Sequence, residues 1–285
     1  MRCHLCNSEA IESVQGRVRD RPEVAIRRCT ECGLVFLDSF SHVHDSFYEA
    51  DYTEENHSTL DWQAFLNGCL QDDERRYNQL RSTLINRTYL DVGCGAGGVL
   101  LKARGVSKNV TGVEPQSRWR DLLLGAGINT VPSLRDVADA GYDVISLFHV
   151  LEHIPEPVPF LKELLSKCSK GGRIFIEVPN ADDALLSLYR NKAFMEYTYW
   201  SPHLFLYSQH TLARLLEKAG VARERFTITQ FQRFPLANHL MWLAEGLPGG
   251  HSAWSFLDSP GLNEAYSASL ARLGRCDTVC AWIEA

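Results

Sequence analysis

The chain has 285 residues and a formal net charge of −6, with 45% hydrophobic and 22% charged residues. These fractions are those of an ordinary globular protein and exclude a disordered or fibrous chain. The acidic balance argues against a nucleic-acid binder, whose surface is usually basic. The sequence has neither a run of about 18 apolar residues nor the apolar segment of a signal peptide, which predicts a cytoplasmic protein without a membrane span.

Two Cys-x2-Cys pairs lie near the N-terminus, formed by Cys3, Cys6, Cys29 and Cys32. Paired thiolates at this spacing, in a chain without an export signal, are typical of a tetrahedral zinc site. Because cysteine fills all four ligand positions, we expect a structural zinc ion and no open catalytic position. The ion is expected to hold a small zinc ribbon over residues 1–40 together, since so short a segment rarely folds without such a ligand.

Behind the ribbon, the polar segment 41–60 is predicted to be a linker or a lid, to which Tyr48 and Tyr52 contribute aromatic side chains. Residues 61–285 then alternate between short apolar runs and helical patterns. The predicted strands are 88–93, 109–114, 128–131, 142–148, 173–179, 226–232 and 277–284. Strands that alternate with helices predict a parallel sheet with both faces covered. Between the last two strands we expect a loop-rich insertion at about 233–275.

A glycine-rich motif, Leu-Asp-Val-Gly-Cys-Gly-Ala-Gly, occupies residues 90–97 at the end of a predicted strand. Glycines at this place allow a tight turn and let the backbone approach a ligand closely. Glu114 ends the next strand about 20 residues further on, where a carboxylate can accept hydrogen bonds from both ribose hydroxyls of a nucleoside. The pattern therefore predicts a site for a nucleoside-containing ligand.

With Asp91 two residues before the first glycine, this motif resembles the first motif, D-x-G-x-G-x-G, of class I S-adenosylmethionine (SAM)-dependent methyltransferases. The resemblance covers roughly residues 86–220 and recurs at Glu114 and in the segment 143–153. It implies an α/β fold, in which a Rossmann-like seven-stranded sheet has an antiparallel strand seven. The methyltransferase domain would occupy residues 61–285 and would follow the small N-terminal zinc ribbon in the sequence.

The resemblance also implies a role for each matching residue. Asp91 would orient the glycine loop, and Glu114 would bind the ribose of SAM. Leu134 would flank the adenine, while Phe148 and His149 would lie beneath the methyl donor. The complete set of expected SAM-binding residues is Asp91, Gly93, Cys94, Gly95, Gly97, Glu114, Leu134, Phe148 and His149.

The order of ribbon, linker and methyltransferase core further resembles sugar methyltransferases of deoxysugar and surface-polysaccharide pathways. The shared segments are V-L-E-H at 150–153 and, more loosely, P-H-L-F-L-Y at 202–207. Pro202 stands where the C-methylating members have a glutamate, which favours O-methylation over C-methylation. The resemblance thus implies a small-molecule or glycan acceptor, with a sugar hydroxyl of a nucleotide sugar or polysaccharide as the methylated group.

A sugar hydroxyl is a poor nucleophile at neutral pH, so a general base would assist the reaction. Histidine suits this task because its ordinary pKa is near 6.5. We predict His203 as the base, because it lies in the aromatic-rich segment 196–207, and we take His153 and His149 as the alternatives. For each of the three, a purely structural role in the core remains an alternative interpretation.

Three other functions stay open at this point. The first is an RNA methyltransferase guided by the ribbon, although six arginines and six acidic residues leave residues 1–40 without net charge. The second is a sugar C-methyltransferase. The third is a non-catalytic protein with the same fold, against which the intact Asp91, glycine loop and Glu114 argue. The oligomeric state is left open.

Overall fold

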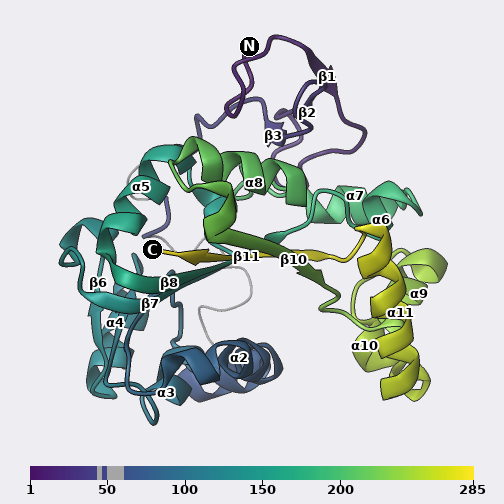
Figure 1. Cartoon of the computed structure of the whole chain (residues 1–285). Coiled ribbons are helices and arrows are strands. Elements are labelled where there is room, and N and C mark those ends of the chain that lie inside the picture. Colours follow the sequence, from purple (N-terminus) through teal and green to yellow (C-terminus); the bar gives the residue numbers. More distant parts are fainter. Residues whose placement is uncertain (44–46, 50–60) are drawn as a thin grey trace. The chain divides into compact units, whose positions relative to one another are not determined.

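The computed structural model describes residues 1–43, 47–49 and 61–285, and Figure 1 labels their helices and strands. The chain divides into two compact units. The first unit comprises residues 1–42, 151–158 and 177–281, and the second comprises residues 43–150, 159–176 and 282–285. Most of the predicted linker or lid, including Tyr52, lies outside the described residues, so that function stays a prediction.

The second unit contains the parallel strands around the glycine-rich motif. They are β4 (Thr88–Val92), β5 (Asn109–Val113), β6 (Asn129–Val131), β7 (Tyr142–Phe148) and the first part of β8 (Cys168–Pro179). β4 pairs in parallel with β5 and with β7, so that Leu90 lies opposite both Thr111 and Ile145. β5 pairs in parallel with β6. Because parallel strands end at one edge of a sheet, the residues that follow β4, β5 and β7 gather at the same carboxyl edge.

Helices α2 and α3 pack against each other in the second unit (Figure 1). The helical elements in the described part of this unit are α2 (Trp62–Leu84), α3 (Gly98–Ala103), α4 (Ser117–Gly125), η1 (Leu134–Asp136) and most of α5 (Pro157–Lys167). Gly98 permits the contact between α2 and α3, since a Cβ atom there would overlap the carboxylate of Asp73. Burial in this contact raises the pKa of Asp73 to about 6.

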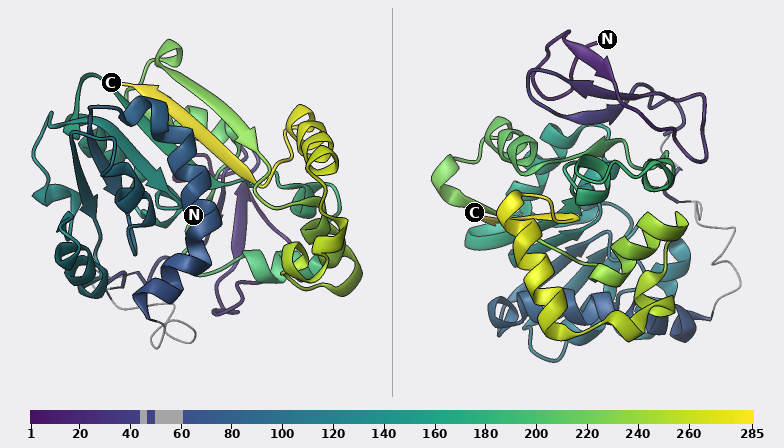
Figure 2. Two further views of the ribbon diagram at one scale, coloured as in Figure 1. Left: turned by 90° about the horizontal axis from the view of Figure 1, so that it is seen from below. Right: turned by 90° about the vertical axis from the view of Figure 1, so that its right-hand side faces the viewer.

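The first unit begins with an antiparallel sheet that carries the cysteines, seen in the right-hand view of Figure 2. In spatial order its strands are β1 (Ile11–Ser13), β2 (Ile26–Cys29), β3 (Val35–Leu37) and β9 (Phe205–Leu206). β9 comes from far along the chain, and it pairs Phe205 with Phe36 and Leu206 with Val35. The shorter helices of this unit are η2 (Leu151–His153), α6 (Ala184–Ser187), α7 (Lys192–Thr198), α8 (Gln209–Lys218) and η3 (Arg223–Arg225).

The central sheet has seven strands in the order β10-β11-β8-β7-β4-β5-β6. Its last two strands in the chain are β10 (Phe226–Phe231) and β11 (Thr278–Glu284). β11 runs antiparallel to β8, because hydrogen bonds join Gly171 to Ala285 at one end and Asn180 to Asp277 at the other. This mixed sheet with its antiparallel strand confirms the predicted Rossmann-like fold.

The insertion at 233–275 is mainly helical, so the prediction of a loop-rich insertion was wrong. It contains α9 (Leu236–Glu245), α10 (Gly250–Ala253), η4 (Ser255–Leu257) and α11 (Pro260–Leu273), which pack together in Figure 2. Its glycine and proline residues lie at helix ends: Pro260 begins α11, and Gly246 and Gly274 end α9 and α11 in left-handed conformation. Among the described residues, no helix has the length and hydrophobicity that a membrane span requires.

Candidate functional site

The four predicted zinc ligands converge on one point in the first unit. The sulfur of Cys3 lies 3.5 Å from that of Cys32, and the sulfur of Cys6 lies 3.5 Å from that of Cys29. All four sulfurs lie within 4.8 Å of one another. A tetrahedral zinc ion, with Zn–S bonds of about 2.3 Å, would hold its sulfurs about 3.8 Å apart. The four-cysteine cluster therefore has the dimensions to hold one metal ion.

In the second unit, Asp91 anchors a buried hydrogen-bond chain under the glycine loop. The hydroxyl of Ser146 donates to Asp91 Oδ1 at 2.6 Å, and the hydroxyl of Tyr89 lies 2.6 Å from Ser146 Oγ and can donate to it. Burial raises the pKa of Asp91 to about 7, although the bond from Ser146 and the charge of Arg76 act in the opposite direction. Asp91 thus joins β4 to β7 directly before the loop.

The three glycines of the loop differ in what surrounds them. All three have positive φ, at 72° for Gly93, 51° for Gly95 and 78° for Gly97. A Cβ atom would overlap the side chain of Val150 at Gly93 and that of Leu123 at Gly97. At Gly95, by contrast, no atom of the described residues lies within 4 Å of the place a Cβ would take. Side-chain packing therefore favours glycine at positions 93 and 97, whereas at Gly95 none of the described residues occupies the place that a ligand could take.

Glu114, directly after β5, supports this loop and is only 6% exposed. Its Oε2 accepts a hydrogen bond from the amide of Gly95 at 2.8 Å, and its Oε1 accepts one from Gln116 at 2.9 Å. Burial raises the pKa of Glu114, and these two bonds oppose the rise. Because each carboxylate oxygen can accept two hydrogen bonds, Glu114 still has capacity for two ribose hydroxyls. Burial, followed by the charges of Asp91 and Glu114, raises the pKa of the Cys94 thiol well above its usual value, which makes Cys94 a poor nucleophile.

The remaining predicted SAM-binding residues follow the neighbouring strands of the second unit. Leu134 begins η1, shortly after β6, and is 5% exposed. Phe148 ends β7, and His149 next to it has a φ of +57°, so the chain turns sharply there. The topology thus brings Glu114, Phe148 and His149 to the carboxyl edge of the sheet, beside the glycine loop. Whether each contacts SAM stays a prediction.

Arg76 of α2 also lies near these residues, and the sequence reasoning missed it. Its guanidinium carbon is 5.0 Å from the centre of the Phe148 ring, and its nitrogen is 4.0 Å from a carboxylate oxygen of Asp73. A guanidinium in this position can bind a carboxylate of a ligand. No pattern in the sequence distinguished Arg76 from a solvent-exposed arginine.

Two of the three predicted histidines meet a glutamate in the first unit. Glu152 and His153 lie in η2, and His203 lies between α7 and β9; one ligand atom of each lies within 4.8 Å of the other two. We call these three residues the His–Glu cluster. The imidazole centres are 5.0 Å apart. Nδ1 of His153 lies 2.8 Å from the carbonyl oxygen of Pro202; since a carbonyl only accepts, Nδ1 carries a proton and donates it. His149 belongs to the second unit.

The His–Glu cluster is chemically able to do two things. The carboxylate of Glu152, which is 0% exposed, can stabilise an imidazolium beside it, so the histidines can accept a proton from a substrate. Two imidazoles and one carboxylate are also a ligand set for a divalent metal ion.

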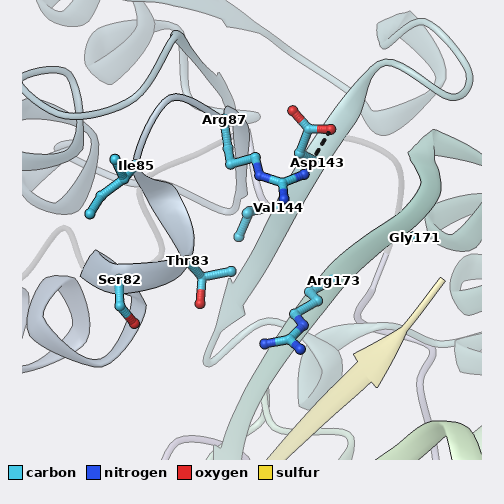
Figure 3. A pocket seen from close by; sticks show the side chains of 8 residues that line it. All are labelled: Ser82, Thr83, Ile85, Arg87, Asp143, Val144, Gly171 and Arg173. Atoms are coloured by element: carbon cyan, nitrogen blue, oxygen red, sulfur yellow. Dashed lines mark ion pairs between the residues drawn. The ribbon is translucent and has the colours of Figure 1, made fainter.

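A pocket of about 470 Å³ lies elsewhere in the second unit, at the amino ends of β4 and β7 (Figure 3). Arg87, just before β4, forms an ion pair of 3.8 Å with Asp143 at the start of β7. The pocket is lined by Ser82, Thr83, Ile85, Arg87, Asp143, Val144, Gly171 and Arg173. It contains none of the predicted site residues, and the glycine loop follows the opposite, carboxyl end of β4.

A family model described as "Methyltransferase domain" matches residues 52–223. The chain belongs to this methyltransferase family. The methyltransferase is 31% identical over 114 residues to the ubiquinone biosynthesis O-methyltransferase of Shewanella pealeana. This alignment covers 36% of this chain and 48% of that protein. It is 32% identical over 116 residues to the protein of the same name from Marinobacter nauticus, covering 36% and 49%. The chain therefore matches about half the length of these relatives.

Solved structures share the fold of this methyltransferase. A SAM-dependent methyltransferase from Archaeoglobus fulgidus matches with a TM-score of 0.50 and 22% identity, over 75% of this chain and 94% of that chain. One from Thermotoga maritima matches with a TM-score of 0.52 and 15% identity, over 82% and 95%. The family match confirms the predicted methyltransferase domain, and the fold is one that SAM-dependent methyltransferases share.

Proposed function

We propose that this methyltransferase transfers the methyl group of SAM to a hydroxyl of a small molecule, and that the His–Glu cluster accepts the hydroxyl proton. The observation that carries the proposal is the cluster itself, in which buried Glu152 lies beside His153 and His203. SAM supplies an already activated methyl group when bound. The protein is left with two tasks, which are to orient the reactants and to accept a proton.

We assign the binding of SAM to the residues around the glycine loop. Glu114 would accept hydrogen bonds from the ribose, and the backbone at Gly95 would lie against the methionine part. Arg76 would pair with the methionine carboxylate, because it is a cation beside Phe148. Asp91 would hold the loop in place through Ser146. The buried carboxylates of Asp91 and Glu114, and a Gly95 that no other described residue crowds, support this assignment.

Alanine substitutions in the loop separate its two roles. Gly97→Ala is expected to lower the free energy of unfolding by about 2 kcal/mol or more, because a left-handed backbone costs a non-glycine residue about 1–2 kcal/mol and the methyl group overlaps Leu123. Gly95→Ala bears only the backbone cost, and it is expected to weaken SAM binding instead. Denaturant unfolding and titration calorimetry of both variants test this. Equal effects of the two variants on both quantities would contradict the assignment.

Within the His–Glu cluster, we propose His203 as the base. His203 is partly exposed, so an acceptor can reach its ring, whereas His153 is only 9% exposed. His153 is the second candidate, because it also lies beside Glu152 and its ring is oriented by the bond from Nδ1 to Pro202. Glu152 would stabilise the protonated ring in either case. His149 remains the third candidate.

For the acceptor we propose a sugar hydroxyl, and the structure favours no particular sugar. The support is the pair of segments at 150–153 and 202–207, which together supply all three members of the cluster. The relatives named above favour a second candidate, a hydroxyl of an intermediate in ubiquinone biosynthesis. We also propose that the metal of the four-cysteine cluster is a structural zinc ion, since all four ligands are thiolates.

The proposed base is tested with a trideuteromethyl SAM donor and a panel of nucleotide sugars and ubiquinone precursors, with mass spectrometry of the products. His203→Ala is expected to lower kcat by about 10²–10⁴-fold, the usual contribution of a general base, without weakening SAM binding. His210→Ala, at an exposed position in α8, is the matched control and should retain full activity. Full activity in the His203 and His153 variants alike would exclude a base in the cluster, and methyl transfer to carbon would exclude O-methylation.

A further inference from the structure

We call residues 1–42 the cysteine ribbon, and its residues contact the chain both before and after His203. The segment 197–206 carries His203, and it also carries Pro202, the hydrogen-bond partner of His153. We propose that the ribbon is a positioning module for the His–Glu cluster, and that Asp20 is the positioning residue on which this depends most. The proposal rests on the proposed function only for the chemical role of His203.

Before His203, the contacts converge on Ser201. Oδ1 of Asp20 accepts a hydrogen bond from the amide of Ser201 at 3.0 Å, and Oδ2 accepts one from its hydroxyl at 2.6 Å. Nε2 of His42 lies 2.8 Å from the carbonyl oxygen of Ser201 and donates to it. All three hydrogen-bonding groups of Ser201 are thus bound by residues 20 and 42, only two positions before His203.

After His203, the contacts continue through the backbone of Leu204. The amide of Leu37, in β3, donates to the carbonyl oxygen of Leu204 at 3.0 Å, and the amide of Leu204 donates to the carbonyl oxygen of Glu152 at 2.9 Å. β3 then pairs with β9 immediately beyond. A continuous set of backbone bonds therefore runs from the ribbon, through the residue next to His203, to the glutamate of the cluster.

Arg19 adds a third contact at the aromatic side of the segment. Its amide donates to the carbonyl oxygen of Tyr199 at 3.0 Å. Its guanidinium carbon lies 4.9 Å from the ring centre of Tyr197 and 4.7 Å from that of Trp200. The ring centre of Trp200 is itself 5.7 Å from that of His203. The ribbon thus also orders the aromatic surroundings of the proposed base.

The zero net charge of residues 1–40 fits a ribbon that contacts the segment 197–206 better than one that binds RNA. A ribbon that guided RNA would be expected to present a basic surface, whereas this one has no net charge. Its acidic Asp20 and its arginine Arg19 are both engaged with the segment 197–206. Because His153 depends on the carbonyl of Pro202 for its tautomer, loosening of this segment would disturb both histidines.

The test compares Asp20→Ala with Asp20→Asn by hydrogen exchange and by NMR of histidine side chains labelled with ¹⁵N. In Asp20→Ala, the amides of residues 200–206 are expected to exchange about tenfold faster or more, because two charge-assisted hydrogen bonds are lost. In the same variant, the imidazole pKa values of His153 and His203 are expected to differ from those of the wild type. Asp20→Asn should restore both quantities, because an asparagine can accept from the amide and donate to the hydroxyl of Ser201.

Glu12→Gln is the matched control, since it removes one negative charge from an exposed position on β1. It should change neither the exchange of residues 200–206 nor the histidine pKa values. The proposal is overturned if exchange and pKa values in Asp20→Ala equal those of the wild type, or if asparagine fails to restore them. Neither readout needs an acceptor, so an inactive histidine would refute the proposed function and leave this result unaffected.

Discussion

Glu114→Ala is expected to abolish measurable binding of SAM. The carboxylate is the proposed acceptor for two ribose hydroxyls, and hydrogen bonds to a charged group contribute about 1.5–3 kcal/mol each. Their loss alone corresponds to about 10²–10⁴-fold in the dissociation constant. The substitution also removes the bonds that hold the amides of Gly95 and Gln116, so the loop itself loses support. Titration calorimetry with SAM measures the effect directly.

Glu114→Gln provides the matched comparison. Its amide oxygen can still accept one hydrogen bond from the loop, but its NH2 group cannot accept another. We therefore expect affinity between those of the wild type and the alanine variant. Unfolding of each protein without SAM shows how much of the loss arises from a damaged fold. An alanine variant that is folded and binds SAM as tightly as the wild type would remove Glu114 from the donor site.

Cys32→Ser is expected to reduce the zinc content from about one ion per chain to nearly none, and to unfold the ribbon. A serine hydroxyl is a poor zinc ligand, and structural zinc sites contribute about 10–16 kcal/mol to the folding of small domains. The strands β1, β2 and β3 have only three, four and three residues, and so small a sheet depends on the metal for its stability. Elemental analysis measures the ion, and hydrogen exchange in residues 1–42 measures the fold.

Cys69→Ser, in α2 of the second unit, is the control for this substitution and should retain the metal. SAM binding should survive in both cysteine variants, because the residues proposed to bind SAM lie in the second unit. A Cys32→Ser protein with full zinc content and a protected ribbon would show that the cluster is not a zinc site. A wild-type protein that contains another metal in place of zinc would show the same.

Much of the fold could be predicted because the sequence alternates clearly between strand and helix patterns. β7 has the predicted bounds of 142–148, and α3 begins where the glycine motif ends. The prediction of a loop-rich insertion at 233–275 was wrong for a physical reason. Glycine and proline occur at the ends of helices as well as in loops, and Gly246, Pro260 and Gly274 lie at helix ends. β9 has only two residues and depends on its pairing with β3, which no local pattern could reveal.

For the candidate site, the sequence predicted residues that occur in motifs and missed residues that depend on tertiary contacts. The four cysteines meet as their spacing implied, and His153 meets His203 although 50 positions separate them. Arg76 and Asp20 were missed, because the role proposed for each rests on a contact with a residue that is distant in sequence. Only the folded chain shows these contacts, which join Arg76 to the ring of Phe148 and Asp20 to Ser201.

The central claim, a methyltransferase that binds SAM at the loop beside Glu114, is tested most directly by native mass spectrometry. The wild-type protein and Glu114→Ala are measured with and without added SAM. We expect the wild-type mass to increase by one SAM molecule, on a protein that already carries one zinc ion, and Glu114→Ala to keep the zinc without taking up SAM. A wild-type protein that takes up no SAM, or a Glu114→Ala variant that takes up as much, would contradict the account.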